Sequence, residues 1–377
     1  MLKKIIMKNI SSIKECIIDF KKKSYKFLND NINNGYVNPI GIYGHNGSGK
    51  TSFFKGITTL INLFNASVDN LYPFIVNHFL FLDYQKNKKK NPRNIEASIN
   101  LFFEVNQNEY EYFIETSVTE SITKEYLKHN GNLVFERELS SLVYKSESKE
   151  VTFASLIPAL RFLAQKEITD QRIQEAFTFI SSFSFADLTK MGLSGGFITS
   201  KYFYNQNSLD LTVNKGLEIK ELLREYDEFP IFSIIKKGND SNSENKLSNY
   251  FIKYENVEGE IPISFISDGM LSQSVLLSLI LSLPKDSVLF IDEMSRALHP
   301  SALSSFIKIV KKKNIQLVFS SHNTVEMQEL RPDQIYFAKW DQGFSKYYRL
   351  SDIYPAIREV NNIEKMYLSG TFDEEMK

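Results

Sequence analysis

The stretch GHNGSGKT, residues 44–51, decides how this chain folds. It fits the pattern G-x-x-x-x-G-K-[ST] at every fixed position. Its glycines allow the backbone to curl so that successive N–H groups point inward at a phosphate, and the following helix presents its positive end to the same anion. The sequence predicts an apolar strand before it, over 39–43, and a helix after it, from Lys50 to about Phe64. A simple glycine-rich turn would not explain both flanking elements, so we predict a phosphate-binding loop.

Several residues of this loop have side chains or backbone groups suited to a nucleoside triphosphate. Lys50 is expected to neutralise the β- and γ-phosphates, and the hydroxyl of Thr51 is expected to ligate Mg²⁺. The predicted nucleotide contacts in this part of the chain are Gly44, Asn46, Gly47, Ser48, Gly49, Lys50, Thr51 and Ser52.

A second motif, VLFIDE over 288–293, reads as a buried strand that ends in two carboxylates. We expect Asp292 to bind Mg²⁺, directly or through water, and Glu293 to activate the attacking water as a general base. The alternative is an ordinary helix cap followed by a first-turn acid. Beside a complete phosphate loop, the catalytic interpretation is favoured.

Two short segments are candidates for a segment, here called the signature, that contacts the phosphate bound by a second subunit. Ser267, Asp268 and Gly269 begin a largely apolar, predicted buried helix and stand shortly before the acidic strand. LSGG at 193–196 is closer to the usual signature sequence, but the residues after it read as strand and turn rather than helix. We therefore favour 267–269, with an ordinary capped helix as the alternative.

The segment VFSSHN, 318–323, places a histidine directly after a predicted strand. An imidazole there would hydrogen-bond the terminal phosphate and the attacking water, so His322 is the predicted γ-phosphate sensor rather than a structural histidine. His299 is assigned instead to a subunit-contact loop. The remaining histidines lack metal-ligand spacing to one another; they are His45, His78 and His129.

Strands and helices alternate from Ile261 onward, which predicts an α/β fold with a mainly parallel core sheet. The two-residue period between 95 and 138 predicts an antiparallel meander with turns near Asn106 and at Asn130, and 152–186 reads as helical. The basic turn 85–93 and the polar segment 238–249 read as solvated loops. We predict an N-terminal lobe (1–150), a helical or mixed insertion (151–255) and a C-terminal lobe (256–377), with 1–65 and 256–377 forming one discontinuous core.

The composition narrows the function classes. The chain has 377 residues, which allows two or three structural units, and its 45 basic and 45 acidic residues cancel, so total charge demands neither nucleic acid nor an anionic membrane. The single cysteine, Cys16, excludes an intramolecular disulfide and is expected to be a buried thiol. No signal peptide or apolar run near the ~20 residues of a membrane span is visible, so cytoplasmic residence is expected.

Together, GHNGSGKT, SDG, VLFIDE, SRALHP and SSHN resemble the ABC-type core of SMC and RecF proteins. DEMSRALHP, SSHNT, LRPDQIYFAKW and NNIEKMYLSGTF are more closely similar to stand-alone bacterial AAA-family, ABC-like ATPases of abortive-infection and antiphage modules. This resemblance implies a P-loop NTPase with a two-lobed head that dimerises around two ATP molecules. SDG followed by Met270, in place of LSGGQ, departs from the usual signature.

The resemblance also implies roles for individual residues. The loop residues would bind ATP and Mg²⁺, Asp292 would bind Mg²⁺, Glu293 would be the base and His322 the switch. Ser267 and Gly269, with Asp268 between them, would act on the nucleotide of the partner subunit. The resulting protein would be a homodimer or higher oligomer.

Two functions follow from this resemblance. The first is an ATP-hydrolysing dimer that senses infection or controls a separately encoded toxin or nuclease in a bacterial antiphage system. The segment after His322 is too short for an appended TOPRIM nuclease domain, so ATP hydrolysis is the expected chemistry. The alternative is a RecF-like or SMC-like ATPase of DNA repair or maintenance, which would bind DNA through local basic surface such as 86–93 or 311–313. The long separation of Lys50 from Asp292 disfavours a transporter subunit.

Overall fold

The structure is a computed structural model. The residues that it describes are 1–77, 96–118, 121–144, 147–150, 156–188, 197–199, 208–225, 232–237, 249–296 and 300–376. The basic turn 85–93, LSGG at 193–196, His78 and His299, all discussed above, lie outside these residues. The polar segment 238–249 also lies outside them, except for its last residue.

The phosphate loop directly follows β5, an interior strand of a seven-stranded sheet. The strand order of this sheet is β13-β12-β17-β18-β5-β19-β20. β12, β17, β18, β5 and β19 are parallel to their neighbours, while β13 and β20 pair antiparallel at the two edges. Their bounds are β5 Ile40–Tyr43, β12 Ser184–Asp187, β13 Phe197–Thr199, β17 Val288–Asp292, β18 Gln316–Ser320, β19 Ile335–Asp341 and β20 Phe344–Arg349. The predicted mainly parallel α/β core is confirmed.

Both faces of this sheet are buried, which explains the uninterrupted apolar run of β17. Val288 and Phe290 pack with helix α1 (Lys50–Asn65) on one face. Leu289 and Ile291 pack on the other face, with α7 (Asp268–Ser282) and α8 (Pro300–Lys312). Successive side chains of a strand point to opposite faces, so a strand covered on both sides is apolar at every position.

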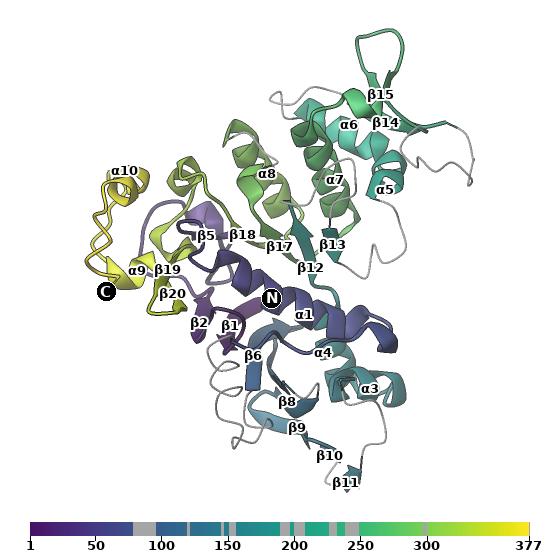
Figure 1. The fold of residues 1–377 in the computed structure, drawn as a ribbon, viewed down its shortest axis with the longest axis vertical. Helices are drawn as coiled ribbons and strands as arrows, with labels where there is room; N and C mark the ends of the chain where they lie inside the picture. The colour runs from purple at the N-terminus through teal and green to yellow at the C-terminus, as the bar shows by residue number, and fades with distance from the viewer. Residues whose placement is uncertain are drawn as a thin grey trace.

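An antiparallel sheet lies on the other side of α1 (Figure 1). Its order is β11-β10-β9-β8-β7-β6-β1-β2. The bounds are β1 Leu2–Lys8, β2 Glu15–Asp19, β6 Glu96–Val105, β7 Asn108–Ser117, β8 Ile122–His129, β9 Asn132–Glu138, β10 Ser141–Tyr144 and β11 Glu147–Glu150. The predicted turns are present, with positive φ at Asn106, Gln107, Asn130 and Gly131. Helices α3 (Ala159–Lys166) and α4 (Gln171–Ser181) pack against this sheet.

One boundary prediction is wrong. The stretch 152–186 contains α3 and α4, but its last residues belong to β12, which pairs with β17 in the core sheet. The apolar residues of SFA suit a buried strand as well as a helix, and over so few residues periodicity cannot separate the two. The segment 151–255 therefore contributes a strand to the core. The division at residues 150 and 255 otherwise stays a prediction.

A smaller unit carries the predicted signature helix. It contains a three-stranded sheet, β14-β15-β16, and helices α5 and α6, which Figure 1 shows grouped around α7. The bounds are α5 Ser208–Asn214, α6 Gly216–Glu225, β14 Phe232–Lys236, β15 Tyr250–Tyr254 and β16 Ile261–Pro262. The remaining described α-helices are α9 Leu350–Ile353 and α10 Ile363–Leu368. A short hairpin pairs β3 Ile32–Asn33 with β4 Tyr36–Val37. Among the described helices, none is long and apolar enough to cross a bilayer.

A fully buried arginine ties the N-terminal segment to the edge of the core sheet. Arg331 donates two hydrogen bonds to Asp333, from Nε at 2.9 Å and from Nη2 at 3.1 Å. Its Nη1 also donates to the carbonyl oxygen of Phe27 at 2.7 Å. A buried charge is tolerated when paired and fully hydrogen-bonded, as here.

A second buried group, Glu326, links the carboxyl ends of two core strands. Its carboxylate accepts hydrogen bonds from Ser321, at 2.9 Å, and from Tyr43, at 3.4 Å. Ser321 directly follows β18, and Tyr43 ends β5 immediately before the phosphate loop. Burial raises the pKa of Glu326 to about 8, against an ordinary value of 4.5.

This raised pKa predicts a pH-dependent stability that Glu326→Gln removes. The folded state holds a proton on Glu326 that the unfolded chain releases near pH 4.5, so the stabilising contribution is complete below that pH and is lost as the pH rises to about 8. The free energy of unfolding should fall over this window by up to about 1.4 kcal/mol per pH unit relative to the variant. Urea unfolding at pH 5, 7 and 9 measures it. Exposed Glu258→Gln is the control, and parallel pH profiles for wild type and Glu326→Gln would contradict the assignment.

Candidate functional site

The backbone conformation of the phosphate loop requires glycine at two positions. Gly44 has φ +149°, and a Cβ there would lie 2.3 Å from the carbonyl oxygen of Ala338 on β19. Gly49 has φ +101°, and a Cβ there would lie 1.8 Å from the hydroxyl of Ser345 on β20. Other residues at either position would be both strained and in collision. The neighbouring strands thus hold the loop at its two ends.

Lys50 bends back over the loop that precedes it. Its Nζ donates to the carbonyl oxygens of Gly44, at 2.8 Å, and His45, at 3.3 Å. Burial lowers the pKa of Lys50, while the carboxylates of Glu293 and Asp292 act in the opposite direction. The loop and the acidic strand are therefore electrostatically coupled.

Ser48 provides an independent sign of a ligand. Its hydroxyl is buried and has no hydrogen-bond partner among the described residues. A buried hydroxyl without a partner carries a desolvation cost, which a bound phosphate oxygen would relieve. The predicted phosphate contact at Ser48 fits this observation.

Thr51 and Asp292 meet at the carboxyl end of β17. Asp292 is buried, and its carboxylate accepts hydrogen bonds from Ser320 and Thr51. Burial raises the pKa of Asp292, and these two hydrogen bonds oppose the shift. A hydroxyl and a carboxylate suit Mg²⁺, which takes one or two protein carboxylates together with substrate phosphates rather than a full protein cage. Consistent with this, the described residues contain no group of three or more His, Cys, Asp or Glu able to hold a metal alone.

The structure adds two residues that sequence reasoning missed. Asp187, at the end of β12, lies in register with Asp292, is buried, and raises the pKa of Asp292 by its charge. Ser320 accepts a hydrogen bond from the backbone N–H of Glu293, at 2.8 Å, while it donates to Asp292. Ser320 belongs to the VFSSHN segment and could have been noticed there. Asp187 has no motif around it, and only the pairing of β12 with β17 brings it to the site.

Glu293 and His322 form a direct contact. Nε2 of His322 lies 2.7 Å from Oε1 of Glu293. Glu293 is buried with φ +60°, whereas the His322 side chain is 36% exposed. The backbone N–H of His322 donates to the hydroxyl of Ser295, at 3.3 Å. The predicted base and the predicted sensor are thus neighbours, and the sensor faces solvent.

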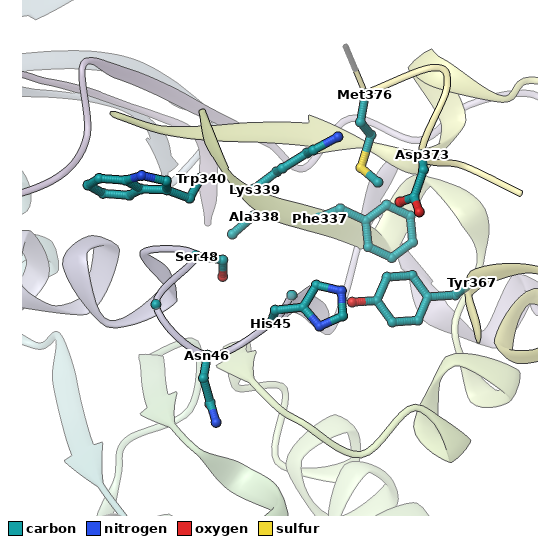
Figure 2. Close-up of a pocket in the computed structure, with 12 residues that line it drawn as sticks. His45, Asn46, Ser48, Phe337, Ala338, Lys339, Trp340, Tyr367, Asp373 and Met376 are labelled. Carbon is teal, nitrogen blue, oxygen red and sulfur yellow. The ribbon is translucent and has the colours of Figure 1, made fainter. Parts of the chain in front are cut away.

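Two residues predicted in the loop point elsewhere. The hydroxyl of Ser52 is 2.7 Å from that of Ser12, which is in turn 2.6 Å from Ser345. Asn46 is exposed, and Figure 2 shows its side chain directed away from the other labelled side chains. Ser52 therefore belongs to a cluster that joins α1 to β20, and its predicted nucleotide contact has no geometric support beyond its place in the loop.

The predicted signature lies on a separate unit of the same chain. Ser267 caps α7, and its hydroxyl accepts a hydrogen bond from the N–H of Met270, at 3.3 Å. Gly269 is in the first turn of α7, and Asp268 begins it. The N-terminus of this 15-residue helix carries a partial positive charge. The segment therefore has the local form of an anion-binding helix start.

A family model named AAA_21, described as "AAA domain, putative AbiEii toxin, Type IV TA system", matches residues 40–328. Comparison with curated proteins gives no match.

Among solved structures, an SMC head bound to the C-winged helix domain of ScpA is similar with a TM-score of 0.50 at 13% identity, over 92% of this chain and 97% of that chain. The SMC head domain from Thermotoga maritima gives 0.44 at 15% identity, over 92% and 98%. The recombination mediator protein RecF with ATP gives 0.39 at 14% identity, over 92% and 99%. At these identities the likeness concerns the fold alone.

The family match extends over more than half of the chain. It includes the phosphate loop, the acidic strand and the segment of His322. The chain therefore belongs to this AAA domain family, and its fold is that of a P-loop NTPase with a two-lobed head similar to the SMC head.

Proposed function

We propose that this protein binds ATP with Mg²⁺, hydrolyses it to ADP and phosphate, and dimerises around the bound nucleotide. The observation that carries this proposal is the meeting of three pairs at one edge of the core sheet: Lys50 with the loop carbonyls, Thr51 with Asp292, and Glu293 with His322. Each pair supplies one requirement of phosphoryl transfer, namely phosphate binding, metal binding and activation of water.

In this mechanism, Lys50 exchanges its carbonyl contacts for the β- and γ-phosphate oxygens. Thr51 and Asp292 would hold Mg²⁺, which when bound supplies positive charge to the phosphates. Glu293 accepts the proton of the attacking water, and His322 fixes the carboxylate by donating from Nε2. Since Nε2 is the nitrogen nearest to Glu293, the neutral imidazole needs its hydrogen there to make this bond.

The position of the signature supports the proposed dimer. Ser267, Asp268 and Gly269 begin α7 in a unit separate from the phosphate loop, and we propose that they contact the γ-phosphate held by a second copy. In a two-fold dimer the same contact occurs twice, so two nucleotides would be enclosed. The γ-phosphate held by the second copy would thus be the anion that binds at the start of α7.

For the biological role, we propose control of a separately encoded toxin or nuclease in a bacterial antiphage system. The support is the description of the matching family, which names the AbiEii toxin and a toxin-antitoxin system. The alternative, an ATPase of DNA repair or maintenance, is supported by the similarity to an SMC head. In that structure the head is bound to a winged-helix domain, which illustrates how such a fold takes a protein partner.

Lys50 is predicted to be needed for tight nucleotide binding. Lys50→Ala should weaken ATP binding on the order of 100-fold, because charged hydrogen bonds worth about 1.5–3 kcal/mol each are lost. Fluorescent ATP titration measures it. Lys55→Ala is the matched control, since Lys55 lies on the same helix α1 and is exposed. Equal affinities for the two variants would refute the assignment of Lys50.

Glu293 is predicted to be needed for ATP hydrolysis but not for ATP binding. Glu293→Gln should retain ATP, lower turnover by about 10²–10⁴-fold through loss of the base, and accumulate as a dimer. Phosphate release and light scattering after size exclusion provide the two readouts. Exposed Glu359→Gln should behave as wild type. A Glu293→Gln protein that hydrolyses at the normal rate and stays monomeric in saturating ATP would overturn the mechanism.

Phage protection in cells and DNA binding in solution distinguish the antiphage role from the DNA-maintenance role. In cells carrying the gene with its neighbours, Lys50→Ala should lose protection against phage, while Lys55→Ala should keep it. Gel shifts with duplex, gapped and single-stranded DNA, with and without ATP, test the alternative. Tight ATP-dependent DNA binding without a partner, together with unchanged plaque counts for Lys50→Ala, would favour DNA maintenance.

A further inference from the structure

A cavity of about 460 Å³ adjoins the phosphate loop on the side of β19. Residues 44–48 of the loop form one wall, residues 337–340 of β19 form another, and the C-terminal segment supplies Tyr367, Asp373 and Met376. The mechanism above assigns no occupant to it. The cavity is nevertheless continuous with the nucleotide site, because the two share the first half of the loop.

Four of the twelve residues that line the cavity carry rings: His45, Phe337, Trp340 and Tyr367. Phe337 stacks on Tyr367 with centroids 4.9 Å apart, and His45 stacks on the same tyrosine at 6.5 Å. Figure 2 shows these three rings together at one end and Trp340 at the other. Trp340 is 45% exposed at the rim. Such a lining favours a flat apolar group, since aromatic rings prefer to pack edge to face or offset against one another.

The same chain carries an unpacked aromatic residue close to the signature. Phe265 is 77% exposed, although its neighbours Ile263 and Ile266 are buried. It ends a short 3-10 turn, Ile263–Phe265, two residues before Ser267. The turn is fixed by its buried isoleucines, so the ring is presented outward by ordered backbone.

We propose that in the ATP-bound dimer Phe265 of each copy inserts into the aromatic cavity of the other. This inference rests on the proposed function, in which Ser267 contacts the nucleotide of the partner. Two residues of chain span at most about 7 Å, so a ring at 265 must arrive beside the loop when Ser267 does. The cavity borders that loop, and two-fold symmetry makes the contact reciprocal. One contact thus accounts for both the exposed ring and the open aromatic cavity.

Cross-linking between two single-cysteine proteins tests the contact directly. Phe265→Cys and Lys339→Cys, each combined with Glu293→Gln, are mixed with ATP and a short bis-maleimide. Lys339 lines the cavity, and the native Cys16 is buried and should not react. We expect a cross-linked dimer that requires both variants and ATP. Leu217→Cys replaces Phe265→Cys in the control, because Leu217 is an exposed apolar residue of the same unit.

A second measurement uses Phe265→Ala in the Glu293→Gln protein. ATP affinity of the monomer should be unchanged, while dimerisation should weaken on the order of 30-fold, as for a central aromatic anchor of an interface. Leu217→Ala should dimerise normally. Trp340 is the only tryptophan of the chain, so its emission should shift with dimerisation and not with ATP binding to the monomer.

The outcomes separate this inference from the proposed function. No ATP-dependent dimer in any variant would overturn both. A normal dimer with no cross-link, and with Phe265→Ala unchanged, would overturn the Phe265 contact alone. A Trp340 response to ATP at concentrations where the chain is monomeric would also overturn it, because the cavity would then bind the nucleotide itself.

Discussion

The burial of both faces of the core sheet is the constraint on which the rest of the structure depends. β17 packs against α1 through alternate residues and against α7 and α8 through the others. The polar side chain of β17 is therefore confined to its carboxyl end, at Asp292. In a parallel sheet the carboxyl ends of the strands lie at one edge, where ligands bind near the point at which strand connections diverge. The phosphate loop after β5 and the acids after β17 consequently lie at the same edge.

The placement of the phosphate loop and the acidic residues at one edge of the sheet affects their pKa values. Burial opposes the charged forms of both Lys50 and Asp292, lowering the pKa of the first and raising that of the second. Asp187 adds to the effect on Asp292, whereas the hydroxyls of Ser320 and Thr51 oppose it. A divalent cation and phosphate oxygens are ligands that would satisfy these opposite charges together. The site is thus arranged for a charged ligand rather than for internal neutrality.

The surrounding structure supports the loop from several directions. β19 and β20 approach Gly44 and Gly49 so closely that no larger residue fits. Tyr43 and Ser321 are joined through Glu326, which ties the loop's strand to the segment of His322. The C-terminal segment reaches the loop through the stacking of Tyr367 on His45. Strands from opposite ends of the sequence therefore fix the position of one short loop.

Residue types and their local spacing were enough to predict the main motifs, namely the glycine pattern at 44–51, the acidic strand at 288–293, His322 and the antiparallel meander. These depend on residue type and spacing over short distances, so they can be predicted without a fold. Which strands are neighbours could be learned only from the folded chain. In the folded chain, residues 184–186, the end of the stretch predicted as helical, belong to the core sheet, Asp187 lies beside Asp292, and an aromatic cavity lies between the loop and the C-terminal segment. Pairing between distant strands depends on packing across the whole core, which no local pattern encodes.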